Sequence, residues 1–255
     1  MTQLQLAKTT AKQAGKELKK RFYSRKFSTQ LKSKHEIVTT ADKLAEKIII
    51  AGIKKQFPDH AILAEESGRN KNKSNYLWII DPLDGTTNFF MHNPLFSVSI
   101  GLAYKNEILL GVVYVPILDE LYYAEKGKGA FVNGKRIKVS QTNEIKDTFL
   151  TFCHGNKITA LNTAINFYGK LKKTARDFRQ LGSAAIECAY VARGITDAIV
   201  IPGVKSWDVA AGTILVSEAG GKVVDLKGKE WTIKSNDILA TNGKIEKPLL
   251  KLIKT

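Results

Sequence analysis

The strongest chemical signal in the chain is the segment 81–89, DPLDGTTNF, which directly follows a short and fully apolar run. A strand buried on both faces would carry Asp81 to its carboxyl end, where ligands bind in α/β sheets. Pro82 and Gly85 predict a turn that returns Asp84 close to Asp81. Two carboxylates held this close repel each other unless a cation lies between them or one takes a proton, and oxygen ligands favour Mg²⁺ or Mn²⁺ over zinc.

The same segment predicts a place for a phosphate. Residues 85–87 (GTT) can begin a helix, whose N–H groups and positive dipole end would bind an anion. The alternative is a turn capped by its own aspartates, since D-x-x-D pairs are common in turns. An aspartate at the end of an apolar strand nevertheless needs hydrogen bonds or a cation to compensate for its burial. Carboxylates beside a phosphate-binding helix start therefore favour phosphoryl chemistry.

Three further acids are candidates for the same site. Glu65 follows the apolar residues 61–64, although taken alone it is an ordinary exposed loop acid. Asp208 begins an apolar helix, where a first-turn acid needs no further role. Asp42 fits a capping box with Thr39, which explains it without any catalytic function.

The elements that must position these acids are predicted from periodicity and punctuation. Apolar residues spaced by three and four after Thr2, the expected N-cap, predict a helix that reaches Phe22, and a polar loop follows over 24–34. We then expect a helix over 40–57 ended by Pro58, strands over 61–64 and 77–80, and a polar loop over 68–75.

The rest of the chain alternates between turn signals and short apolar runs. Closely spaced strands in an antiparallel meander are predicted over 97–104, 108–115, 120–125 and 130–139. Strands over 149–153, 174–181, 196–201, 222–226 and 237–241 are then interspersed with helices over 158–171, 183–193, 208–219 and 244–253. This order predicts an α+β or layered α/β/α/β/α body. We expect one domain over 1–255, with the antiparallel sheet in its N-terminal half (about 1–145) and the alternating elements in its C-terminal half (about 146–255).

Composition narrows the class of protein. The chain has 255 residues, of which 44% are hydrophobic and 25% charged, so disorder, coiled coil and disulfide scaffolds are excluded. No run of about 18 apolar residues occurs, and the first residues do not form a signal peptide, so we expect no membrane association. Cys153 and Cys188 have no companions at metal-ligand spacing and indicate reduced core thiols in a cytoplasmic protein.

The net charge of +16 favours anionic partners, and its distribution is uneven. Residues 1–35 hold ten Lys or Arg residues against one acid, Glu17. The simplest interpretation is a solvated helix face, and the alternatives are an electrostatic funnel for an anionic substrate or an RNA-binding surface. No RNA-recognition motif is present, and aromatic residues adjoin the basic ones only at Phe22, Tyr23 and Phe27.

Two long stretches resemble the two signatures of the inositol monophosphatase family. Residues 78–89 (WIIDPLDGTTNF) are similar to the first signature, and residues 207–212 (WDVAAG), continuing through 218–221 (EAGG), to the second. Shorter matches are EES at 65–67, GKGAF at 127–131, NG at 133–134 and GSAA at 182–185. The resemblance covers roughly residues 1–245. It implies a five-layered αβαβα fold and lithium-sensitive, Mg²⁺-dependent hydrolysis of phosphate monoesters by a homodimer.

The resemblance also implies a set of metal ligands. Glu65, Asp81 and the backbone carbonyl of Leu83 would hold a first metal ion. Asp81, Asp84 and Asp208 would hold a second, and such a pair stabilises the attacking and leaving oxygens of an in-line displacement. A third and weaker ion would lie near Glu65.

The remaining implied roles concern the water and the substrate. Thr86, hydrogen-bonded to Asp42, would orient and deprotonate the attacking water together with Glu65. The N–H groups of Gly85 and Thr86 would hold the phosphate. Other substrate contacts would come from Asp84 and Asp208 and, around the leaving alcohol, from Gly182, Ser183 and Ala184.

One departure from the family pattern bears on specificity. Seven residues before the aspartate of the second signature, many inositol phosphatases carry a glutamate that accepts ring hydroxyls, and this chain has Ile201. The loss of that acceptor predicts relaxed specificity, unless a neighbouring acid such as Glu187 replaces it. Pro202 would reshape the pocket, and Met91 stands where members usually show a polar residue.

The sequence therefore predicts a metal-dependent phosphatase with inositol 1-phosphate as the default substrate. Two alternatives lie in the same superfamily. One is fructose-1,6-bisphosphatase activity, which the basic surface and Ile201 favour slightly, and the other is hydrolysis of the 3′-phosphate of adenosine 3′,5′-bisphosphate. An alternative from another class is an RNA- or transcription-complex-binding protein, which rests on the basic residues 1–35.

Overall fold

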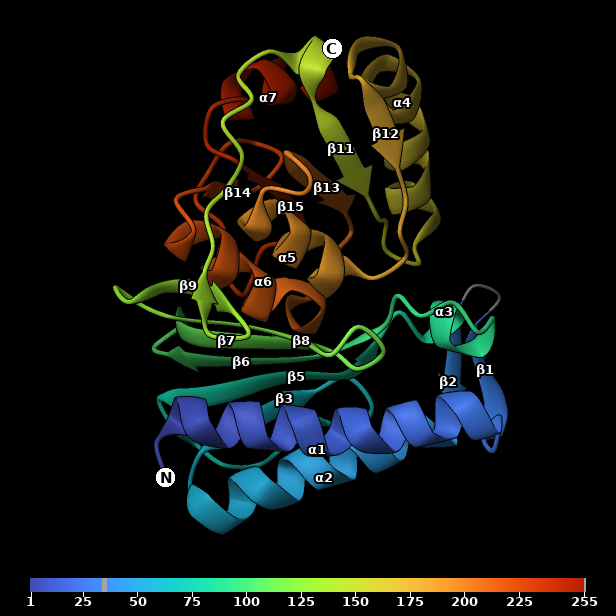
Figure 1. Cartoon of the computed structure of the whole chain (residues 1–255), viewed down its shortest axis with the longest axis vertical. Coiled ribbons are helices and arrows are strands. Elements are labelled where there is room, and N and C mark those ends of the chain that lie inside the picture. Colours follow the sequence, from blue (N-terminus) through green and yellow to red (C-terminus); the bar gives the residue numbers. More distant parts are fainter. Residues whose placement is uncertain (34–35, 255) are drawn as a thin grey trace.

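The computed structural model describes residues 1–33 and 36–254 of the chain (Figure 1). Its helices are α1 (Gln3–Ser24), α2 (Thr40–Gln56), α3 (Thr86–Phe90), α4 (Ile158–Thr174), α5 (Ala184–Arg193), α6 (Ser206–Glu218) and α7 (Glu246–Lys254), with a 3₁₀ turn η1 (Ile145–Asp147). Its strands are β1 (Thr29–Ser33), β2 (Glu36–Thr39), β3 (Ala61–Ala64), β4 (Gly68–Arg69), β5 (Tyr76–Asp84), β6 (Ser97–Tyr104), β7 (Glu107–Val115), β8 (Glu120–Glu125), β9 (Gly129–Val132), β10 (Lys135–Arg136), β11 (Phe149–Phe152), β12 (Asp177–Arg179), β13 (Ala198–Pro202), β14 (Lys222–Val224) and β15 (Asp237–Thr241).

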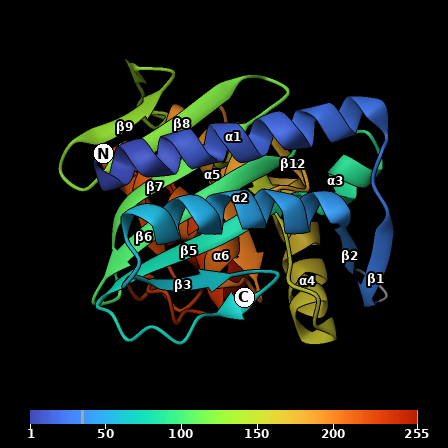
Figure 2. The ribbon, with the colours of Figure 1, turned by 90° about the horizontal axis from the view of Figure 1, so that it is seen from below.

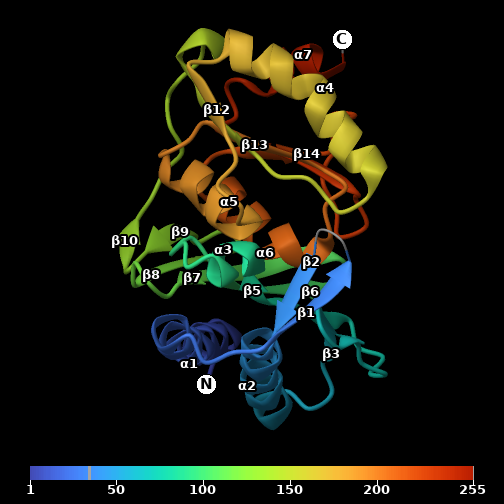
Figure 3. The same cartoon turned by 90° about the vertical axis from the view of Figure 1, so that its right-hand side faces the viewer.

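These elements stack in five layers. Helices α1 and α2 lie side by side across one face of an eight-stranded sheet ordered β10-β9-β8-β7-β6-β5-β3-β4 (Figure 2). Helices α5 and α6 lie between this sheet and a five-stranded sheet ordered β12-β11-β13-β15-β14, and α4 and α7 cover the outer face of the second sheet (Figure 3). The predicted αβαβα sandwich is therefore confirmed.

Helix α1 forms as its sequence dictates. The hydroxyl of Thr2 accepts the N–H of Gln5 at 3.2 Å, and the Gln5 side chain returns a bond to the Thr2 N–H at 3.0 Å, which closes a capping box. The apolar face is buried against the sheet, while Lys12, Lys16 and Lys20 are exposed. The predicted N-terminal helix and its cap are confirmed.

Helix α6 sits unusually close to the first sheet because two strands carry glycine beneath it. A Cβ atom on Gly111 of β7 would lie 2.4 Å from the backbone oxygen of Ala211, and one on Gly101 of β6 would lie 3.2 Å from the Cβ of Ala210. The absence of side chains at these two positions lets the helix backbone rest directly on the strands. This contact fixes the start of α6, where Asp208 lies.

The sequence prediction was wrong in three segments, the smallest being Gly68–Arg69, which was expected to be part of a loop and forms β4 beside β3. The polar stretch over 24–34 was expected to be a loop, yet residues 29–33 form β1, which pairs with β2 in a two-stranded ribbon; Lys34 lies outside the described residues. Residues 130–139 were expected to form one strand, but Asn133 and Gly134 adopt positive φ angles of 47° and 82° and turn the chain into the hairpin of β9 and β10. The other predicted elements are present, with ends that shift by a few residues.

Two expectations about environment can be compared with the described residues. Within residues 1–33 and 36–254, no helix is both long and apolar enough to cross a membrane. Both cysteines are free thiols, with Cys188 buried and Cys153 partly buried.

Candidate active site

Parallel pairing of β3 with β5 brings Glu65 beside Asp81. The register matches Ala64 with Ile80, and the N–H of Glu65 donates to the Ile80 carbonyl at 3.1 Å. Because parallel strands end at the same edge of a sheet, the next residue of each strand carries its carboxylate to that edge. A side-chain hydrogen bond links the Glu65 and Asp81 carboxyl groups and helps to raise the pKa of Asp81.

Asp84 comes close to Asp81 through a β-bulge. The chain does not reverse at this point, as the predicted turn required, because β5 continues from Asp81 to Asp84. Asp81 faces Ser99 and Asp84 faces Ser97 on β6, so β5 has one residue more than its partner over this stretch. Side chains three positions apart in a regular strand point to opposite faces, and the extra residue corrects that alternation.

The carboxylate of Asp84 is held by the start of α5. Its Oδ1 accepts the N–H of Ala184 at 3.1 Å, and its Oδ2 accepts the N–H of Ala185 at 3.0 Å. Oδ2 also accepts the hydroxyls of Ser97, at 3.2 Å, and of Ser183, which is the N-cap of α5. The segment expected to surround the leaving alcohol therefore contacts a predicted metal ligand.

Asp208 completes the acidic cluster from the first turn of α6. Its Oδ2 accepts the N–H of Lys205 at 2.8 Å, so it also serves as a helix-start acid, the simpler of its two interpretations. Burial raises the pKa of Asp208 to about 8, with further contributions from the charges of Asp84 and Glu65. This electrostatic coupling places Asp208 in the same cluster as the acids of β3 and β5.

The acids of the cluster resist ionisation in the absence of a cation. Burial raises the pKa of Asp81 well above its usual range, and the charges of Glu65, Asp84 and Asp208 raise it further. Burial also raises the pKa of Asp84 to about 6, despite four hydrogen-bond donors that favour its charged form. Within the described part of the chain, no Lys or Arg forms an ion pair with Asp81, Asp84 or Asp208.

The donor set of this cluster fits a hard divalent cation. All the side-chain ligands are carboxylate oxygens, Asp81 and Asp84 are buried, and a positive ion would relieve the mutual repulsion of the cluster. Among residues 1–33 and 36–254, no three His, Cys, Asp or Glu side chains are already arranged at metal-binding positions. The chemistry of the donors therefore matches the predicted metal, and the N–H groups at the start of α5 hold the carboxylate of Asp84 in place.

A second cluster, Thr86 and Asp42, lies next to the acids. The Thr86 hydroxyl has two acceptors within reach, Oδ1 of Asp42 at 3.1 Å and the carbonyl of Leu83 at 2.9 Å. Oδ2 of Asp42 accepts the N–H and the hydroxyl of Thr39 at 2.8 and 2.6 Å. Asp42 therefore caps α2 and contacts Thr86 at once, and burial raises its pKa to about 6.

Helix α3 begins at the loop that follows the bulge. Gly85 has a φ of 88°, and a Cβ atom there would lie 3.0 Å from the carbonyl of Leu95 and 3.2 Å from that of Gly182. Only glycine fits this left-handed position and this close approach. The two Gly-containing segments that the sequence singled out, 85–87 and 182–184, are thus in direct contact.

Several contacts of the site were not predicted. Ser97 showed no pattern in the sequence, and Ser183, expected around the leaving alcohol, donates its hydroxyl to Asp84 as Ser97 does. Asn88, which lies inside the first signature, donates to the carbonyls of Leu95 and Leu181 at 2.7 and 2.8 Å. These contacts connect residues far apart in the chain, so spacing alone could not predict them.

The residues that depart from the family pattern lie in opposite environments. Ile201 is 2% exposed and belongs to the apolar core that includes α5, α6 and β13. Met91 is 68% exposed, and nothing in the structure explains it. Glu187, the acid considered as a replacement acceptor, is fully buried and bonds to the chain at Leu181 and Gly182, so its carboxylate is not presented to a substrate.

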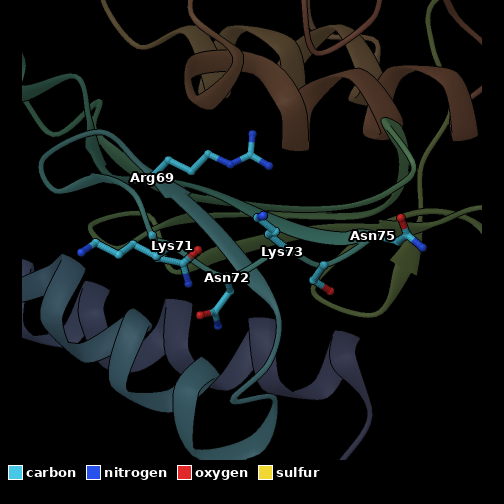
Figure 4. Close-up of a pocket in the computed structure, with 7 residues that line it drawn as sticks. Arg69, Lys71, Asn72, Lys73 and Asn75 are labelled. Carbon is cyan, nitrogen blue, oxygen red and sulfur yellow. The ribbon is translucent and has the colours of Figure 1, made fainter.

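The structure also has a polar hollow of about 510 Å³. It is lined by residues 69–75, the predicted polar loop (Figure 4). None of the predicted site residues lines it, and the side chains of Arg69 and Lys71 extend away from each other (Figure 4). The hollow therefore does not gather its positive charges around one point.

The chain is similar in sequence to proteins of one known family. The model of the inositol monophosphatase family matches residues 2–254. The chain is 41% identical to "Nus factor SuhB" of Pasteurella multocida over 253 residues, covering 98% of this chain and 95% of that one. It is 41% identical to "Fructose-1,6-bisphosphatase/inositol-1-monophosphatase" of Thermotoga maritima over 218 residues, covering 86% and 82%.

Solved structures agree with these sequence comparisons. The extragenic suppressor protein suhB of Bartonella henselae superposes with a TM-score of 0.94 at 35% identity, over 98% of both chains. Inositol monophosphatase from Anabaena superposes with a TM-score of 0.86 at 38% identity, over 98% of this chain and 94% of that one.

Proposed function

The chain belongs to the inositol monophosphatase family, and on that premise we propose that it hydrolyses a small phosphate monoester with the help of Mg²⁺. The observation that carries the proposal is the convergence of Glu65, Asp81, Asp84 and Asp208 beside the hydroxyl of Thr86, four acids from β5, α6 and the loop after β3. A cluster of acids like this one destabilises the folded protein unless a cation binds to it.

In this proposal the acidic cluster provides ligands for two metal ions. Glu65, Asp81 and the carbonyl of Leu83 hold the first, and Asp81, Asp84 and Asp208 hold the second. When bound, the ions supply positive charge to the attacking and leaving oxygens of the phosphate. Mn²⁺ has the same preference for oxygen and could replace Mg²⁺, and a third ion near Glu65 is part of the proposal.

The chain's own residues prepare the attacking water. The single proton of the Thr86 hydroxyl is donated to Asp42 or to the Leu83 carbonyl, so the lone pairs of Oγ1 are left to accept a hydrogen bond from water. Glu65, at the same edge of the sheet, accepts the proton that the water loses. Thr86 orients the nucleophile, and Asp42 orients Thr86.

The substrate is held from both sides of the cluster. The N–H groups of Gly85 and Thr86 at the start of α3 bind the phosphate. The carboxylates of Asp84 and Asp208 accept hydroxyls of the alcohol part, and residues 182–184 line its pocket. Ser183 contributes through Asp84 rather than by direct exposure, because its side chain is buried.

The alcohol part of the substrate has three candidates. Inositol 1-phosphate is our first choice, and fructose 1,6-bisphosphate is the second because the Thermotoga relative carries both names. Ile201 supplies no acceptor for ring hydroxyls, which favours broad specificity among polyol phosphates. Adenosine 3′,5′-bisphosphate ranks last, since the relatives described above are not named for it.

A function from another class has one supporting observation. Relatives from Pasteurella, Salmonella and Escherichia coli are named Nus factor, and the N-terminal residues of this chain are strongly basic. This second candidate is a role in a transcription complex or on RNA, either beside the phosphatase activity or in its place. It is no better supported than hydrolysis.

The oligomeric state and the cellular compartment of the protein are also proposals. A homodimer follows from the family resemblance, and the two free thiols favour a reducing compartment such as the cytoplasm. Sedimentation velocity of the purified chain tests the first of these expectations.

Phosphate release from a panel of monoesters tests the proposed function. With Mg²⁺ present, the protein should hydrolyse inositol 1-phosphate, EDTA should abolish the activity, and Li⁺ should inhibit it. Hydrolysis that persists in EDTA, or no hydrolysis of any monoester with Mg²⁺ or Mn²⁺, would overturn the proposal.

A further inference from the structure

A buried carboxylate lies behind the site and has no place in the chemistry described so far. Glu187 is on the first turn of α5, and its side chain is 0% exposed. Its Oε1 accepts the N–H groups of Leu181 and Gly182 at 3.1 and 3.0 Å, and the thiol of Cys153 at 3.1 Å. The side chain of Thr151 on β11 adds a further hydrogen bond to this carboxylate. A buried carboxylate is costly, so its contacts indicate what it is there to hold.

The segment that Glu187 holds leads directly to Asp84. Residues 181–182 precede Ser183, whose hydroxyl donates to Asp84, and the next two N–H groups, of Ala184 and Ala185, donate to the same carboxylate. The orientation of Asp84 therefore depends on the position of this turn.

The turn is held from its other side as well. The Asn88 amide donates to the carbonyl of Leu181 at 2.8 Å, while Glu187 accepts the N–H of the same residue. Gly182 has a φ of 85°, and a Cβ atom there would lie 3.0 Å from Nδ2 of Asn88. Leu181 is held by hydrogen bonds at both its N–H and its C=O. These two bonds fix the conformation of the turn.

We propose that Glu187 is a positioning residue, which fixes the turn 181–183 so that the start of α5 presents the Asp84 carboxylate in the orientation that the metal and substrate require. The inference rests on the proposed function. Groups that orient metal ligands through hydrogen bonds typically change metal affinity or activity by about 10–100-fold when they are removed. Glu187 touches neither substrate nor metal in this account.

The chain offers a matched control for this role. Glu218 on α6 also accepts two N–H groups of a glycine-containing turn, those of Gly127 and Gly129, both at 2.7 Å. That turn joins β8 to β9 and contains none of the predicted site residues. Glu218→Ala removes the same kind of anchor without touching Asp84.

The test measures kcat/KM for inositol 1-phosphate and, independently, the Kd for Mn²⁺ alone by calorimetry. Glu187→Ala should lower kcat/KM by about 10–100-fold and weaken Mn²⁺ binding by a similar factor. Glu187→Gln keeps an oxygen acceptor for the turn and should restore both values to nearly those of wild type, and Glu218→Ala should change neither. If Glu187→Ala does not fold, Glu187→Asp, whose carboxylate is one methylene short of the turn, should show the same two losses.

Two results would overturn the inference. One is a folded Glu187→Ala or Glu187→Asp variant with wild-type Mn²⁺ affinity. The other is a Glu187→Gln variant that loses as much as Glu187→Ala, because charge and not the anchored turn would then be responsible. If the wild type binds Mn²⁺ but hydrolyses no monoester, the proposed function fails, while the Mn²⁺ affinities still decide the role of Glu187.

Discussion

The carboxylate of Asp42 divides its two oxygens between two tasks, with Oδ1 accepting the hydroxyl of Thr86 at 3.1 Å and Oδ2 holding Thr39 at the start of α2. In the sequence these were competing explanations of Asp42. In the structure they are one arrangement, because the cap fixes the carboxylate that orients Thr86. In the proposed mechanism, the start of α2 therefore helps to position the group that orients the water.

The first prediction concerns this pair. Thr86→Ala should lower kcat by about 100-fold or more with little change in KM, because it removes a group that acts on the nucleophile in the transition state. Asp42→Asn should act through the same hydroxyl. A double-mutant cycle on Thr86 and Asp42 should therefore be strongly non-additive in kcat, and additive effects would contradict the pairing.

Thr39→Ala is the control for the capping role of Asp42. It removes the cap at the start of α2 but leaves the contact between Asp42 and Thr86. The free energy of unfolding should fall by about 1 kcal/mol, and kcat should fall far less than in Thr86→Ala. Urea unfolding and steady-state kinetics on the same preparation separate the two effects.

The second prediction concerns stability in the absence of metal. Asp81→Asn and Asp208→Asn should both fold and should raise the Tm in EDTA, because each removes a charge from a repelling cluster. Asp59→Asn, an exposed position outside the cluster, should leave the Tm nearly unchanged. A lower Tm for both cluster variants would show that the acids stabilise the fold.

The third prediction is the pH dependence of that stability. Because the folded-state pKa of Asp208 is raised to about 8, the native state binds more protons than the unfolded state between roughly pH 4 and pH 8. The contribution of Asp208 to stability is thus lost as the pH rises through this range. In EDTA, the Tm advantage of Asp208→Asn over wild type should grow from pH 5 to pH 8. An advantage that shrinks with rising pH would contradict the assigned shift.

The fourth prediction concerns Ile201. An apolar wall discriminates among substrates by no more than about 200-fold. Wild-type kcat/KM values for inositol 1-phosphate, glycerol 2-phosphate and a sugar phosphate should therefore lie within that range. A much stronger preference for inositol 1-phosphate would contradict relaxed specificity.

The substitution Ile201→Glu distinguishes two views of this position. If the side chain reached the substrate, the glutamate would favour inositol phosphate by about 1–3 kcal/mol. The structure places Ile201 in the core at 2% exposure, so we expect an unpaired buried charge that costs about 3–5 kcal/mol of stability instead. Ile201→Val should cost only about 0.5–1.5 kcal/mol. Chemical unfolding of both variants distinguishes these outcomes.

Local sequence patterns predicted most of the fold because they carry local physics. The apolar run before Asp81 predicts a buried strand, and the cap at Thr2 predicts where α1 begins. Residues 29–33 were missed because β1 pairs only with β2 in a polar ribbon, so neither strand shows the apolar alternation of a buried sheet. The hairpin at Asn133 was missed although its turn residues were recognised, since the apolar residues on both sides suggested one strand.

The candidate site was predicted in composition but not in geometry. Spacing indicated that Asp81 and Asp84 are neighbours, and the bulge that achieves this depends on the register with Ser97 and Ser99 of β6. The anchoring of Asp84 by α5 joins residues about one hundred positions apart, which only the packed fold can establish. Glu187 showed no signal beyond being an acid on an apolar helix.

The most direct test of the central claim is the dependence of phosphate release on Mg²⁺ in wild type and in Asp81→Asn, the acid assigned to both ions. With inositol 1-phosphate as substrate, the wild-type rate should rise from zero in EDTA to a plateau as Mg²⁺ is added. Asp81→Asn, folded by circular dichroism, should stay at background at every Mg²⁺ concentration. Near wild-type turnover of Asp81→Asn at saturating Mg²⁺ would contradict the assignment of the carboxylate cluster as a metal-dependent catalytic site.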